Sequence, residues 1–225
     1  AAMTGFRPLV LAAQGQNIYY TFNSYIGKYC AKVAIKHADL VHSWGDHMTA
    51  KLIELGCSPT KILTLPRGVR TDVFRMYGAE NNGPIHLIST RGLKEHYNID
   101  SIIRACKIVN DSGQRVKLTL AGEGPDRKRL EQLGRKLDLT SIITFAGFVD
   151  NSHLSVLLNK AHIYVSMVST DGVSASLLEA MACGTFPIVT DNVANRLWIE
   201  DGKNGFLVTE KNESILVEKI LLAIS

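Results

Sequence analysis

From Ile85 onwards, short apolar runs alternate with segments of helical character. The first run, Ile85–Thr90, precedes a predicted helix at Asp100–Ser112, and the alternation continues to a last predicted helix at Glu213–Ile224. Apolar residues dominate the runs at successive positions, which is typical of strands buried on both faces. Since such strands are joined by right-handed crossovers, the pattern predicts an α/β fold: a Rossmann-like parallel sheet with helices on both faces.

Loops rich in glycine and other small residues follow several of these strands. The other predicted strands are Val116–Ala121, Ile142–Ala146, His162–Ser166, Phe186–Thr190 and Phe206–Val208. Parallel sheets bind ligands at the carboxyl ends of their strands. We therefore expect the functional residues in the loops that follow them.

The first third of the chain is less regular. Three strands and short helices are predicted before Asn82, which amounts to half of an α/β layer, and the segment looks cut off at its front end. The polar, turn-rich stretch Ala79–Pro84 is the best linker candidate. We predict a partial N-terminal Rossmann-like domain over residues 1–82 and a complete or nearly complete one over 83–225.

Composition excludes several classes of protein. With 225 residues, 46% of them hydrophobic and 20% charged, the chain is typical of globular proteins. No apolar run reaches the ~18 residues of a membrane span, and no signal pattern opens the chain. The four cysteines are scattered, which argues against a zinc site. Aromatic residues do not interleave with basic ones, so no nucleic-acid partner is expected. These features predict a cytoplasmic protein.

The net charge of +4 is unevenly distributed. Up to Asn82 there are nine Lys or Arg against five Asp or Glu, and beyond it sixteen against sixteen. Lys28, Lys32 and Lys36 recur at helical spacing and form one basic stripe. The stripe has two interpretations: a solvated helix face, or a surface that meets anionic lipid or an anionic substrate.

The stretch from Asp171 to Gly184 is the strongest candidate site. A predicted strand, a loop of small residues and a helix start follow one another, which is the geometry that gathers backbone N–H groups around an anion. The small residues are Gly172, Ser174, Ala175 and Ser176. Two carboxylates, Asp171 and Glu179, flank this predicted phosphate loop. A structural alternative remains open, because Ser176 and Glu179 also have capping-box spacing and Asp171 is a common turn residue.

Other strand-end residues are weaker candidates when taken singly. Arg91 follows the first regular strand, with Lys94 three residues later, and a cation there could neutralise a diphosphate. Gly122, Gly124 and Gly147 lie in loops that could also be plain turns. No strand is followed by Gly-x-Gly-x-x-Gly, which lowers the expectation of a nicotinamide or flavin enzyme.

Taken together, the motifs and their order resemble the donor-binding domain of the retaining family 4 glycosyltransferases, which have the GT-B fold. The motifs are Arg91, Ala121-Gly-Glu-Gly-Pro125, Phe145-Ala-Gly-Phe-Val149, Asp171-Gly-Val-Ser, Glu179-Ala-Met-Ala-Cys-Gly184 and Asp201-Gly-Lys-Asn-Gly205. More loosely, residues 38–74 resemble the second half of the acceptor-side domain. The resemblance covers essentially all of Ile85–Val208.

The resemblance implies a role for each matching residue. Glu179 would hold the ribose hydroxyls of a nucleotide, Asp171 would contact the donor sugar, and Arg91 would stabilise the departing diphosphate. Backbone N–H groups from Ser174 to Ser176 would bind the distal phosphate. The implied donor site further includes Lys94, Gly122, Gly124, Phe148, Val149, Gly172, Val173 and Ala175, with Phe148 and Val149 meeting the base. The implied reaction uses no metal or other cofactor.

The chain departs from the family pattern at several positions. Asp171 replaces a glutamate, Tyr97-Asn98 replaces Lys-Gly, and Arg67-Gly68 replaces Asn-Gly. The family's glycine-rich first loop and acceptor-side histidine would lie upstream of Ala1, and its final crossing helix is absent or short. The sequence is therefore expected to be a truncated form of a longer enzyme.

The resemblance implies a hexosyltransferase that moves a sugar from a nucleotide diphosphate sugar to an acceptor hydroxyl with retention of configuration. The expected acceptor is a lipid-linked or cell-surface glycan, with peripheral membrane contact through the basic stripe. Two other hypotheses remain: a fragment that binds the donor nucleotide without turnover, and a nucleotide-sugar epimerase.

Overall fold

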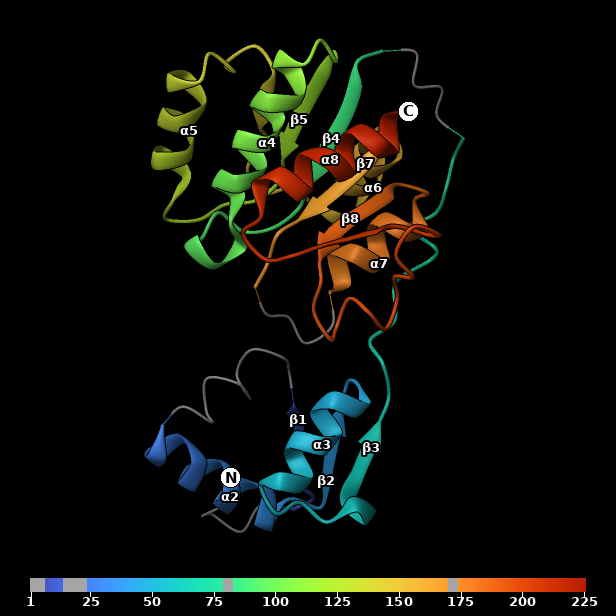
Figure 1. Ribbon diagram of the computed structural model, residues 1–225. Helices are drawn as coiled ribbons and strands as arrows, with labels where there is room; N and C mark the ends of the chain where they lie inside the picture. The colour runs from blue at the N-terminus through green and yellow to red at the C-terminus, as the bar shows by residue number, and fades with distance from the viewer. Residues whose placement is uncertain (1–6, 14–23, 79–82, 170–173) are drawn as a thin grey trace. The chain divides into compact units, whose positions relative to one another are not determined.

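The computed structural model describes residues 7–13, 24–78, 83–169 and 174–225. The described chain divides into two compact units, one up to Gly68 and the other from Val69 (Figure 1). Each unit is described separately.

The first unit is a small parallel sheet with helices. Its strands are β1 (Val10–Ala13), β2 (Leu40–Ser43) and β3 (Ile62–Thr64), hydrogen-bonded in that order. Its helices are α2 (Tyr25–His37), α3 (Asp46–Glu54) and the short η1 (Pro59–Lys61). Val41 of the central strand is buried with Ile35 of α2 and Leu52 of α3. The predicted three-stranded arrangement is confirmed for the described residues.

The second unit contains a six-stranded sheet in which every pair of neighbours is parallel. The strands are β4 (Ile85–Ser89), β5 (Val116–Leu120), β6 (Ile143–Phe145), β7 (Ile163–Ser166), β8 (Phe186–Thr190) and β9 (Phe206–Val208). Their order is β6-β5-β4-β7-β8-β9. The predicted parallel α/β fold is confirmed.

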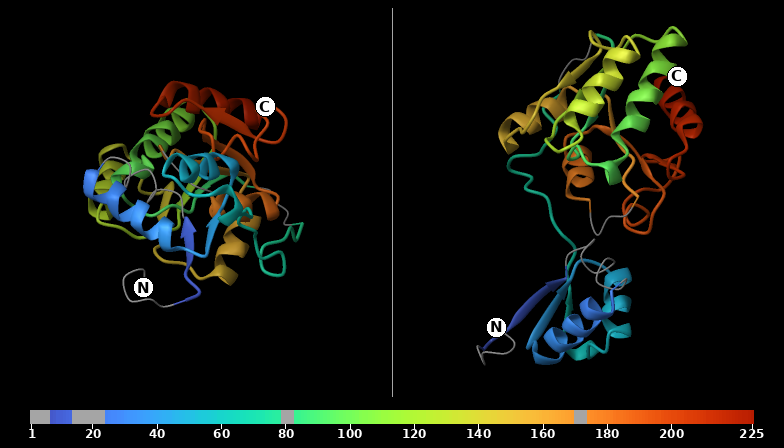
Figure 2. Two further views of the ribbon diagram at one scale, coloured as in Figure 1. Left: turned by 90° about the horizontal axis from the view of Figure 1, so that it is seen from below. Right: turned by 90° about the vertical axis from the view of Figure 1, so that its left-hand side faces the viewer.

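Helices cover both faces of this sheet (Figure 2). They are η2 (Glu95–Tyr97), α4 (Ile99–Asp111), α5 (Arg127–Lys136), α6 (Asn151–Asn159), α7 (Ala175–Ala182) and α8 (Glu213–Ile224). Leu87 of β4 belongs to the core under α4, α5 and α8, whereas its neighbour Ile88 belongs to the core under α6 and α7. Both faces of the strand are therefore apolar, which explains the continuous apolar runs.

Residues Val69–Gly78 belong to the second unit, so the structure divides the chain earlier than the predicted boundary at Asn82. Phe74 is 2% exposed in the core beneath α6 and α7. The Ser155 hydroxyl donates to the carbonyl of Val73 at 2.8 Å, and the backbone N–H of Tyr77 donates to Asn159 at 2.8 Å. One buried aromatic ring and these bonds attach a segment that composition alone assigned to the first domain.

Among the residues the structure describes, no helix has the length and apolar character needed to cross a membrane.

Candidate functional site

The predicted site residues follow four neighbouring strands. Because β6, β5, β4 and β7 are adjacent and parallel, their carboxyl ends share one edge of the sheet. Arg91 follows β4, Gly122 follows β5, Phe148 follows β6 and Ser174 precedes the helix that comes after β7. The fold thus places loops that are far apart in sequence along a single edge, where parallel sheets bind ligands.

Arg91 joins β4 to the segment that starts α7. Its Nε donates to the Ser166 hydroxyl at 3.0 Å, and its Nη2 donates to the Ser174 hydroxyl at 2.5 Å. The guanidinium carbon lies 5.6 Å from the centroid of the Tyr97 ring, within the range of a cation–π interaction. The half-buried guanidinium is therefore oriented by two hydroxyls and one aromatic ring.

Ser174 begins α7 and is 1% exposed. Its hydroxyl accepts from the backbone N–H of Leu177 at 3.3 Å, which makes Ser174 the N-cap of the helix. Ser176 accepts from the hydroxyl of the buried Tyr164 at 3.0 Å. The first turn of α7 contains no acidic residue, so nothing in it opposes an anion at the helix N-terminus. Arg91 and this helix start together form a site suited to phosphate.

The structure tests whether Glu179 is the capping-box partner of Ser176. Because α7 begins at Ala175 behind an N-cap at Ser174, Ser176 lies inside the helix and cannot be the N-cap of a capping box. The capping-box interpretation is therefore wrong. Glu179 lies half-buried in the second turn of α7. Asp171, Gly172 and Val173 lie outside the described residues.

Gly122 and Gly124 have a structural reason to be glycine. A Cβ atom on Gly122 would lie 2.3 Å from the carbonyl oxygen of Arg91, and one on Gly124 would lie 2.1 Å from that of Leu93. The loop after β5 thus packs directly on the backbone that carries Arg91. Contact of either glycine with a donor stays a prediction.

The other predicted donor residues are more open to solvent. The Phe148 side chain is 84% exposed at the end of β6, and Val149 beside it is half-buried. Asp150 follows as the N-cap of α6. Lys94 is exposed where η2 begins. An exposed aromatic ring and a lysine at this edge are compatible with base and phosphate contacts, which stay predictions.

Four residues were missed as site residues: Ser166, which accepts from Arg91, and the consecutive His96, Tyr97 and Asn98. Tyr97 lies near the Arg91 guanidinium, and Asn98 adopts a left-handed conformation, with φ of 49°. The pKa of His96 is lowered by burial first and then by the positive charges of Lys94 and Arg91, so its ring is mainly neutral at pH 7. The position of Asn98 in place of the family's glycine was the available signal, because glycine and asparagine are the residues that most readily adopt this conformation.

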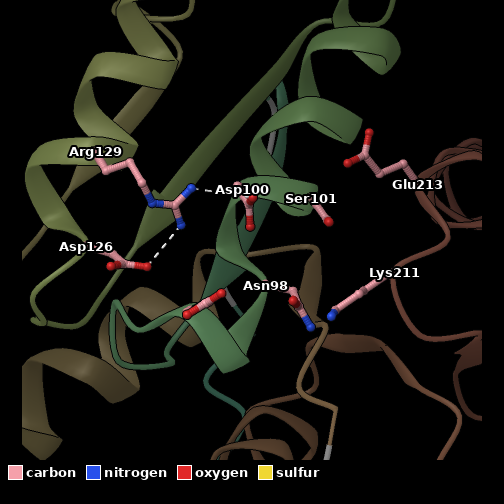
Figure 3. Close-up of a pocket in the computed structure, with 8 residues that line it drawn as sticks. Asn98, Asp100, Ser101, Asp126, Arg129, Lys211 and Glu213 are labelled. Carbon is pink, nitrogen blue, oxygen red and sulfur yellow. Dashed lines mark hydrogen bonds and ion pairs between the residues drawn. The ribbon is translucent and has the colours of Figure 1, made fainter.

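A polar cavity of about 650 Å³ lies beside the start of α4 (Figure 3). Arg129 lies 3.5 Å from Asp100 and 2.9 Å from Asp126, and Glu213 lies 3.7 Å from Arg104. Most of the charges in the cavity are thus already paired. In the part of the chain that the structure describes, no group of three or more His, Cys, Asp or Glu is placed to hold a metal ion.

Several proteins resemble this chain in sequence. WcaL of Salmonella typhimurium, a glycosyltransferase named for colanic acid biosynthesis, is 28% identical over 192 residues, which cover 82% of this chain and 47% of that protein. The amylovoran biosynthesis glycosyltransferase AmsK of Erwinia amylovora is 26% identical over 182 residues, covering 78% and 44%. The chain thus spans about half the length of these relatives.

Solved structures share the fold. HepE of Anabaena in complex with UDP and glucose superposes with a TM-score of 0.85 at 18% identity, over 97% of this chain and 62% of that one. The pneumococcal O-GlcNAc transferase GtfA in complex with UDP and GlcNAc has a TM-score of 0.77 at 19% identity, over 96% and 44%.

The family described as glycosyl transferases group 1 matches residues 71–225, which is more than half of the chain and includes every described residue of the candidate site. The chain therefore belongs to the glycosyl transferases group 1 family.

Proposed function

We propose that this chain is the donor-binding part of a glycosyltransferase that moves a sugar from a nucleotide diphosphate sugar to an acceptor hydroxyl. The observation that supports it most is the orientation of Arg91 toward the N-terminus of α7 by Ser166 and Ser174. A guanidinium and a helix N-terminus stabilise the same developing charge, that of a diphosphate leaving group.

In the proposed reaction, the bond between the anomeric carbon and the diphosphate oxygen breaks, and the acceptor oxygen bonds to that carbon on the same face. The acceptor hydroxyl gives its proton to the departing diphosphate oxygen, and the nucleoside diphosphate leaves. Glu179 would hold the ribose, and Asp171 would hold the donor sugar. The resemblance to retaining enzymes supports retention of configuration without a metal. Relatives named for amylovoran and colanic acid biosynthesis support a polysaccharide acceptor. That the acceptor is lipid-linked and that the reaction takes place on the cytoplasmic side are further parts of this proposal.

Nucleotide binding is the first property to test. Thermal shift of the purified chain against UDP, GDP and ADP should show stabilisation by at least one of them. A ligand at 100 times its dissociation constant adds ~2.7 kcal/mol to the free energy of unfolding. Because the chain spans about half of its relatives, binding and turnover are measured separately. Binding without transfer would identify a donor-binding fragment, whereas epimer formation from donor alone would identify an epimerase.

Replacing Glu179 by alanine should weaken nucleotide binding at least tenfold, equivalent to ~1.4 kcal/mol, because a carboxylate that accepts from two ribose hydroxyls is lost. Isothermal titration with the nucleotide selected by thermal shift measures the effect. Glu218→Ala on α8 is the matched control, because Glu218 is exposed on a helix that covers another part of the sheet. An affinity within twofold of the control would refute the ribose assignment.

We also propose that the exposed face of α2 meets an anionic membrane surface. Tyr25 is 95% exposed and Tyr29 is 70% exposed, at helical spacing with Lys28, Lys32 and Lys36. Tyrosines favour the membrane–water interface and lysines favour anionic lipid, so one helix face combines both.

Removing two of these charges should weaken vesicle binding. Each lysine near an anionic surface contributes ~1 kcal/mol, so the double variant Lys32→Ala/Lys36→Ala should bind phosphatidylglycerol vesicles roughly 30-fold more weakly in sedimentation assays. The control is Lys128→Ala/Lys136→Ala, which removes two exposed charges from α5. Equal binding by both double variants would show that α2 is only a solvated surface.

A further inference from the structure

Three lysines from two separate segments of the first unit line one hollow. The hollow has a volume of about 380 Å³ and lies between the C-terminal half of α2 and the segment that joins α3 to β3. Its lysines are Lys32 and Lys36 of α2 and Lys61, the last residue of η1. The other residues that line it are uncharged, namely Ile35, Leu55, Gly56 and Ser58. The described lining therefore carries three positive charges and no negative one.

Lys61 is held in place by hydrogen bonds within the protein. Its side chain is half-buried, and its Nζ donates to the carbonyl of Ala38 at 2.9 Å and to that of Lys36 at 3.4 Å. These carbonyls lie at the end of α2, where the helix dipole favours a cation. An ammonium group has three N–H donors, so one remains for a further acceptor. Lys61 is thus an oriented cation that loses little side-chain entropy when an anion binds.

The other two lysines add to the same positive field. Lys32 and Lys36 are exposed and lie four residues apart on α2, which places their side chains on one helix face. The lining residues Ile35 and Leu55 are buried, each at 6% exposure. Buried apolar groups keep the local dielectric low, and this strengthens the attraction between the ammonium groups and an anion.

One carboxylate outside the hollow interacts with Lys61. The pKa of Asp39 is lowered first by a hydrogen bond from the backbone N–H of Leu9, and further by Arg7 and by the charge of Lys61. The carboxylate accepts from Leu9 at 2.7 Å and forms an ion pair with Arg7. Asp39 does not line the hollow, and Arg7 balances its charge. The three lysines therefore keep a net positive field in the hollow.

We propose that the hollow lined by Lys32, Lys36 and Lys61 binds a phosphate group. A phosphomonoester carries about −1.5 to −2 charge at pH 7 and three strong acceptor oxygens, which match three ammonium groups. A carboxylate or a phosphodiester, with a single charge, matches them less well. Inorganic phosphate and the head group of a lipid such as phosphatidic acid share the required chemistry.

The hollow is separate from the edge of the sheet where substrates are expected. Ala38 precedes β2 and Lys61 precedes β3, so the hollow lies at the amino ends of these parallel strands. Parallel sheets bind substrates at the opposite, carboxyl ends. The phosphate site does not depend on sugar transfer, and it goes beyond the proposed membrane contact of α2 because it requires Lys61, which lies outside that helix.

Lys61→Gln distinguishes a phosphate site from a basic helix face. The matched control is Lys28→Gln, which removes one charge from an exposed residue of α2 that does not line the hollow. Nuclear magnetic resonance titration of the full chain with inorganic phosphate, at constant ionic strength, follows the backbone N–H signals of Gly56 and Ser58. In the wild type these signals should shift until they saturate. Lys61→Gln should raise the dissociation constant about fivefold, the contribution of one lysine near an anionic group, and Lys28→Gln should leave it within about twofold.

Lys36→Gln tests the site independently of the fold, because Lys61 also bonds to the end of α2 whereas the side chain of Lys36 is exposed. It should raise the dissociation constant for phosphate about fivefold as well. Signals of Gly56 and Ser58 that do not respond to phosphate in the wild type would overturn the site. Equal affinities of Lys36→Gln and Lys28→Gln would overturn it too.

Vesicle binding identifies the source of the phosphate. Phosphatidic acid presents a phosphomonoester and phosphatidylglycerol a phosphodiester, so vesicles of the two lipids are compared at equal zeta potential. Tighter binding to phosphatidic acid that is lost in Lys36→Gln and kept in Lys28→Gln would assign the hollow to a lipid head group. Equal binding to both vesicles, with the phosphate-dependent shifts present, would assign it to free phosphate. Equal binding without those shifts would refute the phosphate site and leave the membrane contact of α2 standing.

Discussion

Replacing Gly124 by alanine is expected to lower the free energy of unfolding by about 3 kcal/mol. A Cβ atom at this position would lie 2.1 Å from the carbonyl oxygen of Leu93 and 2.9 Å from its amide nitrogen. Both are backbone atoms, so no flexible side chain can move aside, and the loop after β5 must separate from the loop after β4. Urea denaturation measures the loss as a lower midpoint at similar slope.

Gly83→Ala is the matched control for this prediction. A Cβ atom on Gly83 would meet nothing within 4 Å, and its φ is not in the left-handed region. Its stability should remain within about 0.5 kcal/mol of the wild type. If Gly124→Ala were as stable as Gly83→Ala, the close packing of the two loops would be refuted, and with it the structural reason for glycine beside Arg91.

The alternation of strands and helices was predictable because strands that are buried on both faces consist mainly of apolar residues, which can be recognised in the sequence. Leu87 and Ile88 face opposite cores, so apolar residues occur on both faces of β4, and the same holds for Ile163 and Tyr164 in β7. Helix ends were likewise predictable from local chemistry: Gly184, with φ of 78°, follows α7 as expected of a left-handed residue after a helix. These features depend only on neighbours in the sequence.

The features that escaped prediction depend on contacts between distant residues. From the sequence alone, Ser174 and Ser176 are equally good N-caps. In the structure Ser174 is the N-cap and also accepts a hydrogen bond from Arg91, whereas Ser176 lies inside the helix and accepts one from Tyr164. The alternation of strands and helices does not reveal the strand order either, since β4 pairs with β7 although three α-helices, one short 3-10 helix and two strands lie between them in the sequence. Phe74 attaches its segment to the second unit through burial that composition does not reveal.

Asn98 illustrates the same limit within the site. From the sequence it counted only as part of a departure from the Lys-Gly of the family pattern. In the structure each residue of the pair Tyr97-Asn98 makes a specific contact. The tyrosine ring lies 5.6 Å from the Arg91 guanidinium, and the asparagine combines a left-handed backbone with two side-chain hydrogen bonds that glycine cannot make. Comparing motifs shows that Tyr97-Asn98 replaces Lys-Gly, but only the folded structure shows which groups these two side chains contact.

Replacing Arg91 by alanine is expected to weaken UDP binding by roughly 10- to 150-fold, since a hydrogen bond to a charged group contributes ~1.5–3 kcal/mol. The guanidinium is already oriented by Ser166 and Ser174, so little side-chain entropy is lost when an anion binds. Arg91→Lys keeps the charge but not the planar fork, and its affinity should lie between those of alanine and arginine. Isothermal titration at two salt concentrations measures both effects, because screening weakens the ionic part.

Arg115→Ala separates this role from a general effect of charge. Arg115 is exposed just before β5, and because the strands are parallel it lies at the edge of the sheet opposite to Arg91. Both variants change the net charge equally, yet only Arg91 adjoins the N-terminus of α7. Ser174 still caps α7 through the Leu177 amide when Arg91 is removed, so the helix start should persist and the lost affinity can be assigned to the guanidinium. If Arg91→Ala bound UDP as tightly as Arg115→Ala, the diphosphate would not lie where this proposal puts it.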